Sequence, residues 1–333
     1  QLAIVVEAND EFALSGYWPE FRTNYDINAT GLSLTDLMLH SIEPKSDGSI
    51  HECCLTDENY RMAREARAHK YEETGKDLTL WLAVGGWGRS QSFEHLVEYE
   101  DTRSELITNL RDLCLKEGID GVDFDWQLPT RPVDFVNYYR LIREAKKVFR
   151  KHGIKLSMAL TKDHHLPTKM YKFVDRIHLI AYEFDLMSGV YHADYDKTRL
   201  MIRGLITRNC PPEKMLLGIP LYGRKNHKPS DMRTIAELVD DHADGKASSI
   251  VTADHVWDGY YYDSPNLIKK KVELAFEYNL AGMYFWELGQ DKIDPTYGPG
   301  GIMTQAVESA VRKVQKARAE AKEETEAAGN DEL

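Results

Sequence analysis

The sequence predicts a single (β/α)8 barrel, and three observations lead to this fold class. Eight short apolar runs with the character of β-strands recur along the 333 residues. Most of them are followed by a segment of helix length, which is typical of a parallel sheet covered by helices on both faces. No glycine-rich phosphate-binding loop follows the first run, which disfavours a nucleotide-binding sheet. Eight such units in this length fit a closed α/β TIM barrel better than an open sheet.

The predicted strands and helices follow from residue patterns. Strands are expected at residues 12–18, 34–42, 78–86, 118–126, 154–160, 175–183, 214–222 and 280–288. Helices are expected at residues 57–72, 96–117, 131–150, 195–208 and 265–279. The clearest helix has an apolar stripe at helical spacing, and Gly153 follows it where a turn should begin. The stripe consists of Phe135, Tyr138, Ile142, Ala145 and Phe149.

The last third of the chain has room for few elements beyond the barrel itself. Residues 223–280, between the seventh and eighth strands, suffice for a helix at 233–241 and a loop or hairpin, but hardly for a separate domain. Residues 303–328 have a helical pattern whose apolar stripe fades after about Ala317. We therefore expect a barrel over residues 1–302, without a large insertion domain, followed by a C-terminal helix and acidic tail over residues 303–333.

Charge and composition exclude several classes of function. Lys and Arg number 42 against 54 Asp and Glu, and a formal charge of −12 would repel nucleic acid. No run approaches the roughly 18 apolar residues of a membrane span, so we expect no membrane insertion. The cysteines Cys53, Cys54, Cys114 and Cys210 lack metal-type spacing, and the sequence leaves their pairing open. We expect no metal and no organic cofactor.

Both ends of the chain indicate the secretory pathway. The chain starts at Gln1 rather than Met, which we interpret as a mature product whose targeting segment has been removed. Residues 330–333 are NDEL, which is close to the tetrapeptides that the retrieval receptor of the endoplasmic reticulum reads. The glycosylation sequon Asn28-Ala29-Thr30 fits the same compartment. We expect the lumen of the endoplasmic reticulum, with the retrieval receptor as a partner; secretion is the alternative.

The fourth predicted strand carries the residues that point to chemistry. Because side chains alternate along a strand, Asp123, Asp125 and Gln127 share one side, and the apolar Val122, Phe124 and Trp126 share the other. The apolar side suits the helix layer, so the acids should face the barrel lumen. Two carboxyls in a lumen cost several kcal/mol unless they share a proton or serve a site. Since barrel enzymes work at the carboxyl ends of their strands, we expect the site here.

Several motifs of the chain, taken in order, resemble glycoside hydrolase family 18, the chitinases and chitinase-like lectins. The segment Asp120 to Gln127 resembles the family signature Asp-x-x-Asp-x-Asp-x-Glu, with Gln in the last position. The other matching segments are LAVGGW at 82–87, AYEFD at 181–185, PPEKMLLGIPLYGR at 211–224 and MYFWELGQD at 283–291. The resemblance covers nearly the whole barrel and implies its fold.

The resemblance also implies roles for individual residues. The family cleaves β-1,4-linked N-acetylglucosamine with the help of the acetamide group of the sugar itself. Asp125 would orient that acetamide, Asp123 would share a proton with Asp125, and Tyr182 would donate a hydrogen bond to the acetamide. Asp120 belongs to the structural part of the signature.

The walls of the cleft are implied in the same way. Trp286 would form the apolar floor under the sugar at the cleavage point. Tyr17, Trp87 and Arg224 would line the cleft, with barrel-end packing as the alternative for the aromatic residues and a structural ion pair as the alternative for Arg224.

Two departures from the family pattern decide the expected function. Gln127 stands at the position of the acid, and an amide has no proton to release near neutral pH. Glu183 replaces the usual Asp beside the acetamide pocket. We therefore expect a carbohydrate-binding protein, or lectin, whose hydrolysis is lost or nearly lost.

Two alternatives stay open. One is an active chitinase or endo-β-N-acetylglucosaminidase whose catalytic Glu has been replaced by Gln127 to trap substrate. The other is a resident interaction protein of the endoplasmic reticulum that uses the barrel as a scaffold. The expected partner is an N-acetylglucosamine oligomer, and the sequence does not separate chitin from the core of an N-glycan.

Overall fold

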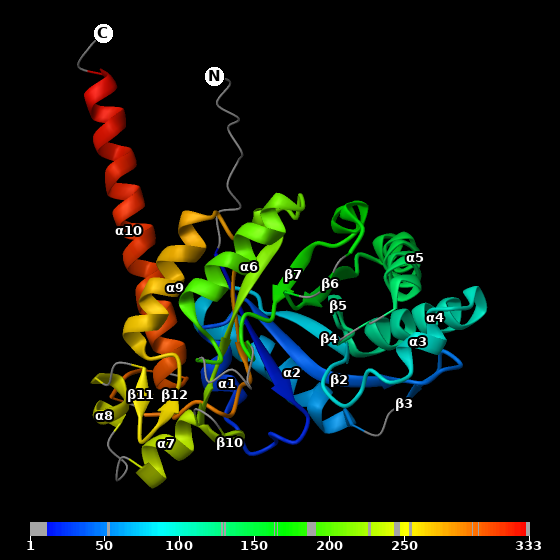
Figure 1. The fold of residues 1–333 in the computed structure, drawn as a ribbon, viewed down its shortest axis with the longest axis horizontal. Helices are drawn as coiled ribbons and strands as arrows, with labels where there is room; N and C mark the ends of the chain where they lie inside the picture. Colours follow the sequence, from blue (N-terminus) through cyan, green and yellow to red (C-terminus); the bar gives the residue numbers. More distant parts are fainter. Residues whose placement is uncertain are drawn as a thin grey trace.

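The computed structural model shows a closed barrel of parallel strands (Figure 1). It describes residues 12–330 apart from 52–53, 128, 130, 163, 165, 185–190, 226–227, 243–246, 253–254, 295 and 299. Within this part of the chain, β1 pairs in parallel with both β2 and β13, which closes the ring. The strands of the ring, in spatial order, are β1 (Ala13–Pro19), β2 (Asp36–Pro44), β4 (Thr79–Gly85), β5 (Gly121–Asp125), β6 (Lys155–Leu160), β7 (Arg176–Leu179), β8 (Met215–Pro220) and β13 (Gly282–Trp286). Each lies within or overlaps one predicted strand, so the predicted fold class is confirmed.

Helices surround the barrel, and most of them lie close to a predicted helix. These are α2 (Asp57–Thr74), α4 (Glu100–Glu117), α5 (Pro132–Phe149), α6 (Tyr195–Thr207) and α9 (Pro265–Glu277). Two short helices, α1 (Ile27–Gly31) and α3 (Phe93–Leu96), were not predicted. Local chemistry explains the ends of the helices. In α2, Thr56 and Asn59 form a reciprocal capping box, and Gly75 ends the helix at φ +69°, where a side chain would be strained. Gly153 ends the 3-10 turn η1 (Arg150–His152) after α5 in the same way, at φ +71°.

The pleat of the strands separates two apolar cores. Between the ring and the helices, Val122, Phe124 and Trp126 join one large buried cluster, as the alternation along β5 predicts. Inside the ring lies a smaller cluster that includes Tyr17 and Tyr284. Asp123 and Asp125 are buried on this inner side, at 0% and 3% exposure. The fold thus brings the acids of β5 to the end of the lumen where the carboxyl ends of the strands lie.

A small sheet follows β8 and was missed from the sequence. It pairs β9 (Tyr222–Lys225) with β10 (Lys228–Thr234) and with β12 (Tyr260–Tyr261), and β12 with β11 (Val256–Trp257). The helices α7 (Ile235–His242) and α8 (Ala247–Thr252) lie between these strands in the chain. The segment therefore holds the expected helix and more than a single hairpin, yet it is no large insertion domain. Strands of two residues carry too little alternation to be recognised.

Three further elements complete the fold: β3 (Ile50–His51) and the 3-10 turns η2 (Thr168–Lys172) and η4 (Pro212–Lys214). The strand β3 pairs antiparallel with the end of β2, outside the ring. The turn η2 stands between β6 and β7, in a connection that has no longer helix among its described residues.

The last helix, α10 (Ile302–Asn330), starts against the barrel and then leaves it (Figure 1). Its first turns are buried and pack beside α9, whereas the described side chains from Lys316 to Glu323 are exposed. Nowhere among the described residues is a helix both long and apolar enough to cross a membrane. The start of the chain at Gln1 and residues 331–333 of the tail lie outside the described residues, so the expectations for them stay predictions.

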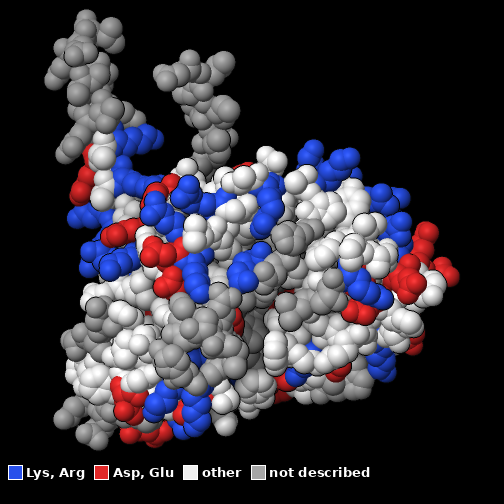
Figure 2. Space-filling view, viewed as in Figure 1, with Lys and Arg blue, Asp and Glu red and all other residues white. Residues whose placement is uncertain are grey.

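The charge of the surface is uneven. On the face shown in Figure 2, Lys and Arg gather along the upper edge, over α5, α6 and α10, although the chain carries a formal charge of −12. The strands of the ring run toward the opposite edge in this view, so the site at their carboxyl ends lies away from this basic edge (Figure 1).

Candidate functional site

The deepest part of the site is the carboxylate of Asp123. Tyr17 of β1 donates from its hydroxyl to Oδ2 at 2.7 Å, and Ser157 of β6 donates to Oδ1 at 2.5 Å. Nδ1 of His178, on β7, lies 3.1 Å from Oδ1. Three different strands therefore fix this one carboxylate in the lumen. Ser157 and His178 were missed from the sequence, because a polar residue in a short strand gives no sign of the distant partners that it meets in the fold.

Asp123 and Asp125 have opposite pKa shifts. Burial alone would raise the pKa of Asp123, but the contact with the His178 ring, together with the hydrogen bonds from Ser157 and Tyr17, holds that pKa below its ordinary value. Burial, followed by the charge of Asp123, raises the pKa of Asp125 to about 7. Near neutral pH the pair therefore holds its proton on Asp125, and Asp123 is the carboxylate.

Gln127 lies directly above this pair. Its Nε2 donates to Oδ2 of Asp125 at 3.1 Å, and its backbone N–H is 3.3 Å from Oγ of Ser90. The alternation along β5 predicts that Gln127 and Asp125 share a side, and their bond agrees with it. An amide here binds and orients but cannot act as an acid.

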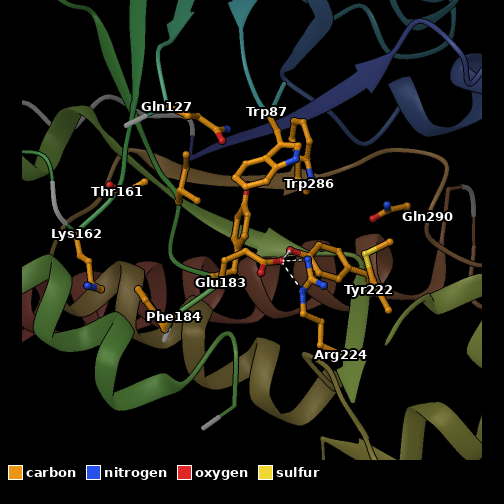
Figure 3. Close-up of a pocket in the computed structure, with 13 residues that line it drawn as sticks. Trp87, Gln127, Thr161, Lys162, Glu183, Phe184, Tyr222, Arg224, Trp286 and Gln290 are labelled. Carbon is orange, nitrogen blue, oxygen red and sulfur yellow. Dashed lines mark hydrogen bonds and ion pairs between the residues drawn. The ribbon is translucent and has the colours of Figure 1, made fainter. Parts of the chain in front are cut away.

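Gln127 lies at one side of a cavity of about 480 Å³ (Figure 3). The cavity is lined by Trp87, Gln127, Thr161, Lys162, Ile180, Tyr182, Glu183, Phe184, Tyr222, Arg224, Met232, Trp286 and Gln290. The lining is mostly apolar with a few polar groups, which is typical of a small-molecule site. A second hollow shares Trp87 and Gln127 with the first and extends past Ser90, Gln91 and Glu94. The side chain of Trp87, 79% exposed, thus stands between the two.

Aromatic rings form the inner wall of the cavity. The ring of Trp286 lies edge-on to Tyr17 at 5.4 Å and to His40 at 4.8 Å between centroids. The hydroxyl of Tyr182 is 3.4 Å from that of Tyr284, and burial raises the pKa of both hydroxyls well above the ordinary value. Tyr182 is therefore a neutral group that can donate a hydrogen bond into the cavity.

Glu183 is anchored on the opposite wall of the cavity (Figure 3). Its Oε1 accepts bonds from Nε and Nη2 of Arg224, both at 2.8 Å, and from the hydroxyl of Tyr222. The backbone of Glu183 has φ +61°, an uncommon conformation for a residue with a side chain. Arg224 thus both lines the cavity and forms an ion pair, so the two roles considered for it are combined.

The sequence matches the model of glycosyl hydrolases family 18 over residues 14–291. This match spans the whole ring of strands and the site. The chain belongs to this family. Sequence identity to individual relatives is low: the probable chitinase 2 of Drosophila melanogaster is 24% identical over 241 residues, and endochitinase 1 of Metarhizium robertsii is 25% identical over 272.

The family 18 chain covers only part of these relatives. The aligned parts are 64% of this chain and 47% of the Drosophila protein, and 67% of this chain and 64% of the Metarhizium protein. The chain therefore spans roughly half to two thirds of the length of these relatives.

Solved structures share the fold at low identity. The GH18 chitinase ChiB of Flavobacterium johnsoniae superposes with a TM-score of 0.77 at 18% identity, over 91% of this chain and 95% of that one. A Glu-to-Gln mutant of the class V chitinase from Nicotiana tobaccum, in complex with NAG4, has a TM-score of 0.72 at 18% identity, over 90% and 99%. The GH18 chitinase of Cycas revoluta, in complex with (GlcNAc)3, has 0.73 at 18%, over 90% and 99%.

Most of the site residues named from the sequence of this family 18 barrel are brought together. Gln127, Tyr182, Glu183, Trp87, Arg224 and Trp286 line the cavity, while Asp125, Asp123 and Tyr17 lie beneath it. Asp120 lies elsewhere, just before β5, where its carboxylate pairs with Arg67 and accepts from the backbone N–H of Leu80 at 2.8 Å. This placement agrees with the structural role expected for Asp120. The last residue of the 181–185 motif lies outside the described residues.

The described residues offer no group of three or more His, Cys, Asp or Glu arranged for a metal ion. Cys114 and Cys210 are buried thiols, and burial raises the pKa of each to about 12. Cys53 lies outside the described residues.

Proposed function

We propose that this family 18 barrel binds β-1,4-linked N-acetylglucosamine oligomers as a lectin and has lost all or nearly all hydrolysis. The observation that carries the proposal is the bond from Gln127 to Asp125 inside an otherwise complete cavity. Ligand contacts come from Asp125, Tyr182 and Trp286, whereas the place of the proton donor is taken by an amide.

Each contact has a physical basis. The carboxyl of Asp125 offers an oxygen to an acetamide N–H, and the neutral hydroxyl of Tyr182 can donate to the acetamide oxygen. Trp286 lines the cavity and is packed against Tyr17 and His40, so it presents a fixed apolar surface on which a sugar ring can stack. Trp87, at the mouth of the cavity, extends that surface toward the second hollow.

Loss of hydrolysis follows from the chemistry of the amide. A positioned general acid contributes about 10²–10⁴-fold to a reaction rate, and more where the leaving group is poor. Gln127 can hold a glycosidic oxygen by a hydrogen bond but has no proton to give it near neutral pH.

The proposal specifies the β-1,4 linkage of the ligand and not the polymer that carries it. Chitin and the core of an N-glycan present the same disaccharide to the cavity. Solved chitinases of the same fold carry NAG4 or (GlcNAc)3, in agreement with a ligand of this class. We also propose that the protein works in the endoplasmic reticulum, where the N-glycan core would be the ligand; residues 330–333 motivate this, with secretion as the alternative.

Titration calorimetry with chitotriose and chitotetraose tests the proposal. We expect binding to the parent chain, and a loss of binding in Trp286→Ala. No binding of either oligomer would overturn the proposal and favour the alternative that the barrel is an interaction scaffold.

The second candidate is an active chitinase or endo-β-N-acetylglucosaminidase seen with its acid replaced. One observation favours it. The residues expected to serve the reaction all lie at or directly beneath the cavity that Gln127 lines, namely Asp123, Asp125, Tyr182 and Trp286. The two candidates share the same binding chemistry and differ only in whether Gln127→Glu restores turnover.

A further inference from the structure

His178 is a buried imidazole in the barrel lumen that none of the roles above uses. Its side chain is 1% exposed, and it lies on β7 below the cavity. Nδ1 contacts Oδ1 of Asp123 at 3.1 Å and the hydroxyl of Tyr17 at 3.2 Å. Nε2 is buried and has no hydrogen-bond partner among the described residues.

Its hydrogen bonds fix the tautomer of the ring. The carboxylate of Asp123 is an acceptor, so the nitrogen that bonds to it must carry hydrogen. The hydroxyl of Tyr17 already donates to the other oxygen of Asp123, at 2.7 Å, and has no second proton to offer Nδ1. Nδ1 of His178 is therefore the protonated nitrogen, and Nε2 faces the aromatic lumen, where the ring of Tyr284 lies 5.2 Å away between centroids.

Other titratable groups surround the pair formed by Asp123 and His178. They are Tyr17 of β1, His40 of β2, Asp125 of β5, Tyr138 of α5 and Tyr284 of β13. Burial raises the pKa of the three tyrosines well above the ordinary value. Burial, with a smaller contribution from Arg89, lowers the pKa of His40 to about 3. The tyrosines and His40 are thus neutral near pH 7. Of the two imidazoles near Asp123, His178 is the one that contacts its carboxylate.

We propose that His178 is a positioning residue, which holds Asp123 as the carboxylate through its Nδ1–H and thereby keeps the shared proton on Asp125. The expected effect of His178 on sugar affinity rests on the proposed function, whereas the location of the proton does not. This role of His178 explains why the two carboxyls differ although both are buried. Asp123 has three donors from other strands of the ring, whereas Asp125 has the amide of Gln127 on Oδ2 and no partner on Oδ1 among the described residues.

This asymmetry has a consequence for the ligand. A protonated Asp125 is neutral, so the cavity floor does not place two negative charges under a neutral sugar. Without the Nδ1–H of His178, Asp123 would keep two hydroxyl donors against the single amide donor of Asp125, so the preference for the proton on Asp125 would weaken. Asp125 would then carry part of the negative charge of the pair.

Infrared difference spectra of the ligand-free protein, taken between about pH 5 and pH 9, test the location of the proton. They report the C=O stretch of protonated carboxyls. In the parent chain we expect a carboxyl that titrates near pH 7 and disappears in Asp125→Asn but not in Asp123→Asn. In His178→Phe, which keeps an aromatic ring, the carboxyl signal that Asp125→Asn removes should become weaker, and a second signal that Asp123→Asn removes should appear. His178→Asn retains an N–H donor and should restore the parental assignment.

Two further measurements keep the inference open to refutation. Nitrogen NMR of the histidine rings in the unmodified protein should show Nδ1 of His178 protonated at alkaline pH, even if His178→Phe does not fold. Chitotriose affinity should fall about tenfold in His178→Phe and recover in His178→Asn. An Nε2-protonated His178, or a proton that stays entirely on Asp125 in His178→Phe, would overturn the inference. Absence of sugar binding in the parent chain would overturn the proposed function and leave the spectra unaffected.

Discussion

Nε2 of Gln127 donates a hydrogen bond of 3.1 Å to Oδ2 of Asp125, whose pKa burial and the charge of Asp123 raise to about 7. The amide therefore lies in contact with the carboxyl that holds the shared proton of the pair. This relationship organises the floor of the cavity as a binding surface, because the bond orders the Gln127 side chain but provides no group above Asp125 that can protonate a leaving oxygen.

Removing the Asp125 carboxyl should weaken ligand binding. If Asp125 accepts the acetamide N–H, Asp125→Ala loses one buried hydrogen bond, and the binding free energy should weaken by about 1–3 kcal/mol. Calorimetry with chitotriose measures this, with Asp112→Ala as a control at an exposed carboxylate on α4, whose affinity should equal that of the parent. Unchanged affinity in Asp125→Ala would remove Asp125 from the ligand site.

Trp286→Ala should abolish measurable binding. Trp286 lines the cavity and is held by ring contacts with Tyr17 and His40, so its loss removes the stacking surface at the centre of the site. Trp87→Ala, at the exposed mouth, should weaken binding of chitotriose less. If Trp286→Ala bound with parental affinity, the cleft would be used in a different way.

The buried proton of Asp125 should appear as a pH dependence of stability. Between the ordinary pKa of 3.8 and about 7, the folded protein keeps a proton that the unfolded chain loses. The free energy of unfolding should therefore fall as pH rises through this range, by roughly 2–4 kcal/mol from this group.

Urea unfolding of the parent and of Asp125→Asn over this pH range measures the effect. Glu287 and Asp291, whose pKa values burial also raises, to about 7 and about 6, contribute equally in both proteins. The difference between the two curves thus isolates Asp125, and parallel curves would contradict the assignment.

The anchor of Glu183 should contribute to stability. Arg224→Leu removes two bonds of 2.8 Å to Oε1 of Glu183 in a partly buried setting, so the free energy of unfolding should fall by about 1–2 kcal/mol. Arg312→Leu is a matched control, because Arg312 pairs with Glu308 but is 75% exposed, and it should change stability by less than about 0.5 kcal/mol. Equal losses in both variants would mean that the ion pair of Arg224 and Glu183 stabilises the fold no more than an exposed pair does.

Strand alternation explains which parts of the site could be predicted. The pattern from Asp123 to Gln127 is enough to place both acids in the lumen, and it was confirmed by their burial and by the packing of Phe124 and Trp126 on the other side. Short apolar runs located the strands of the ring, and apolar residues at helical spacing located the main helices.

Partners from distant strands could not be predicted. Ser157 and His178 lie in other strands, 34 and 55 residues from Asp123, and only the folding of the ring brings them to it. Tyr222 reaches Glu183 across 39 residues in the same way. The sheet after β8 was missed because β11 and β12 are too short to show a pattern.

If the cavity is a sugar site that lacks its acid, the Gln127→Glu variant should reveal it. Parent and variant are assayed side by side on a fluorogenic chitotriose substrate, with binding of the oligomer measured for both. Both proteins should bind, the parent should show no turnover above the buffer rate, and any turnover should be confined to Gln127→Glu. Turnover by the parent at the rate of the variant would contradict this expectation, since a donor other than residue 127 would then supply the proton.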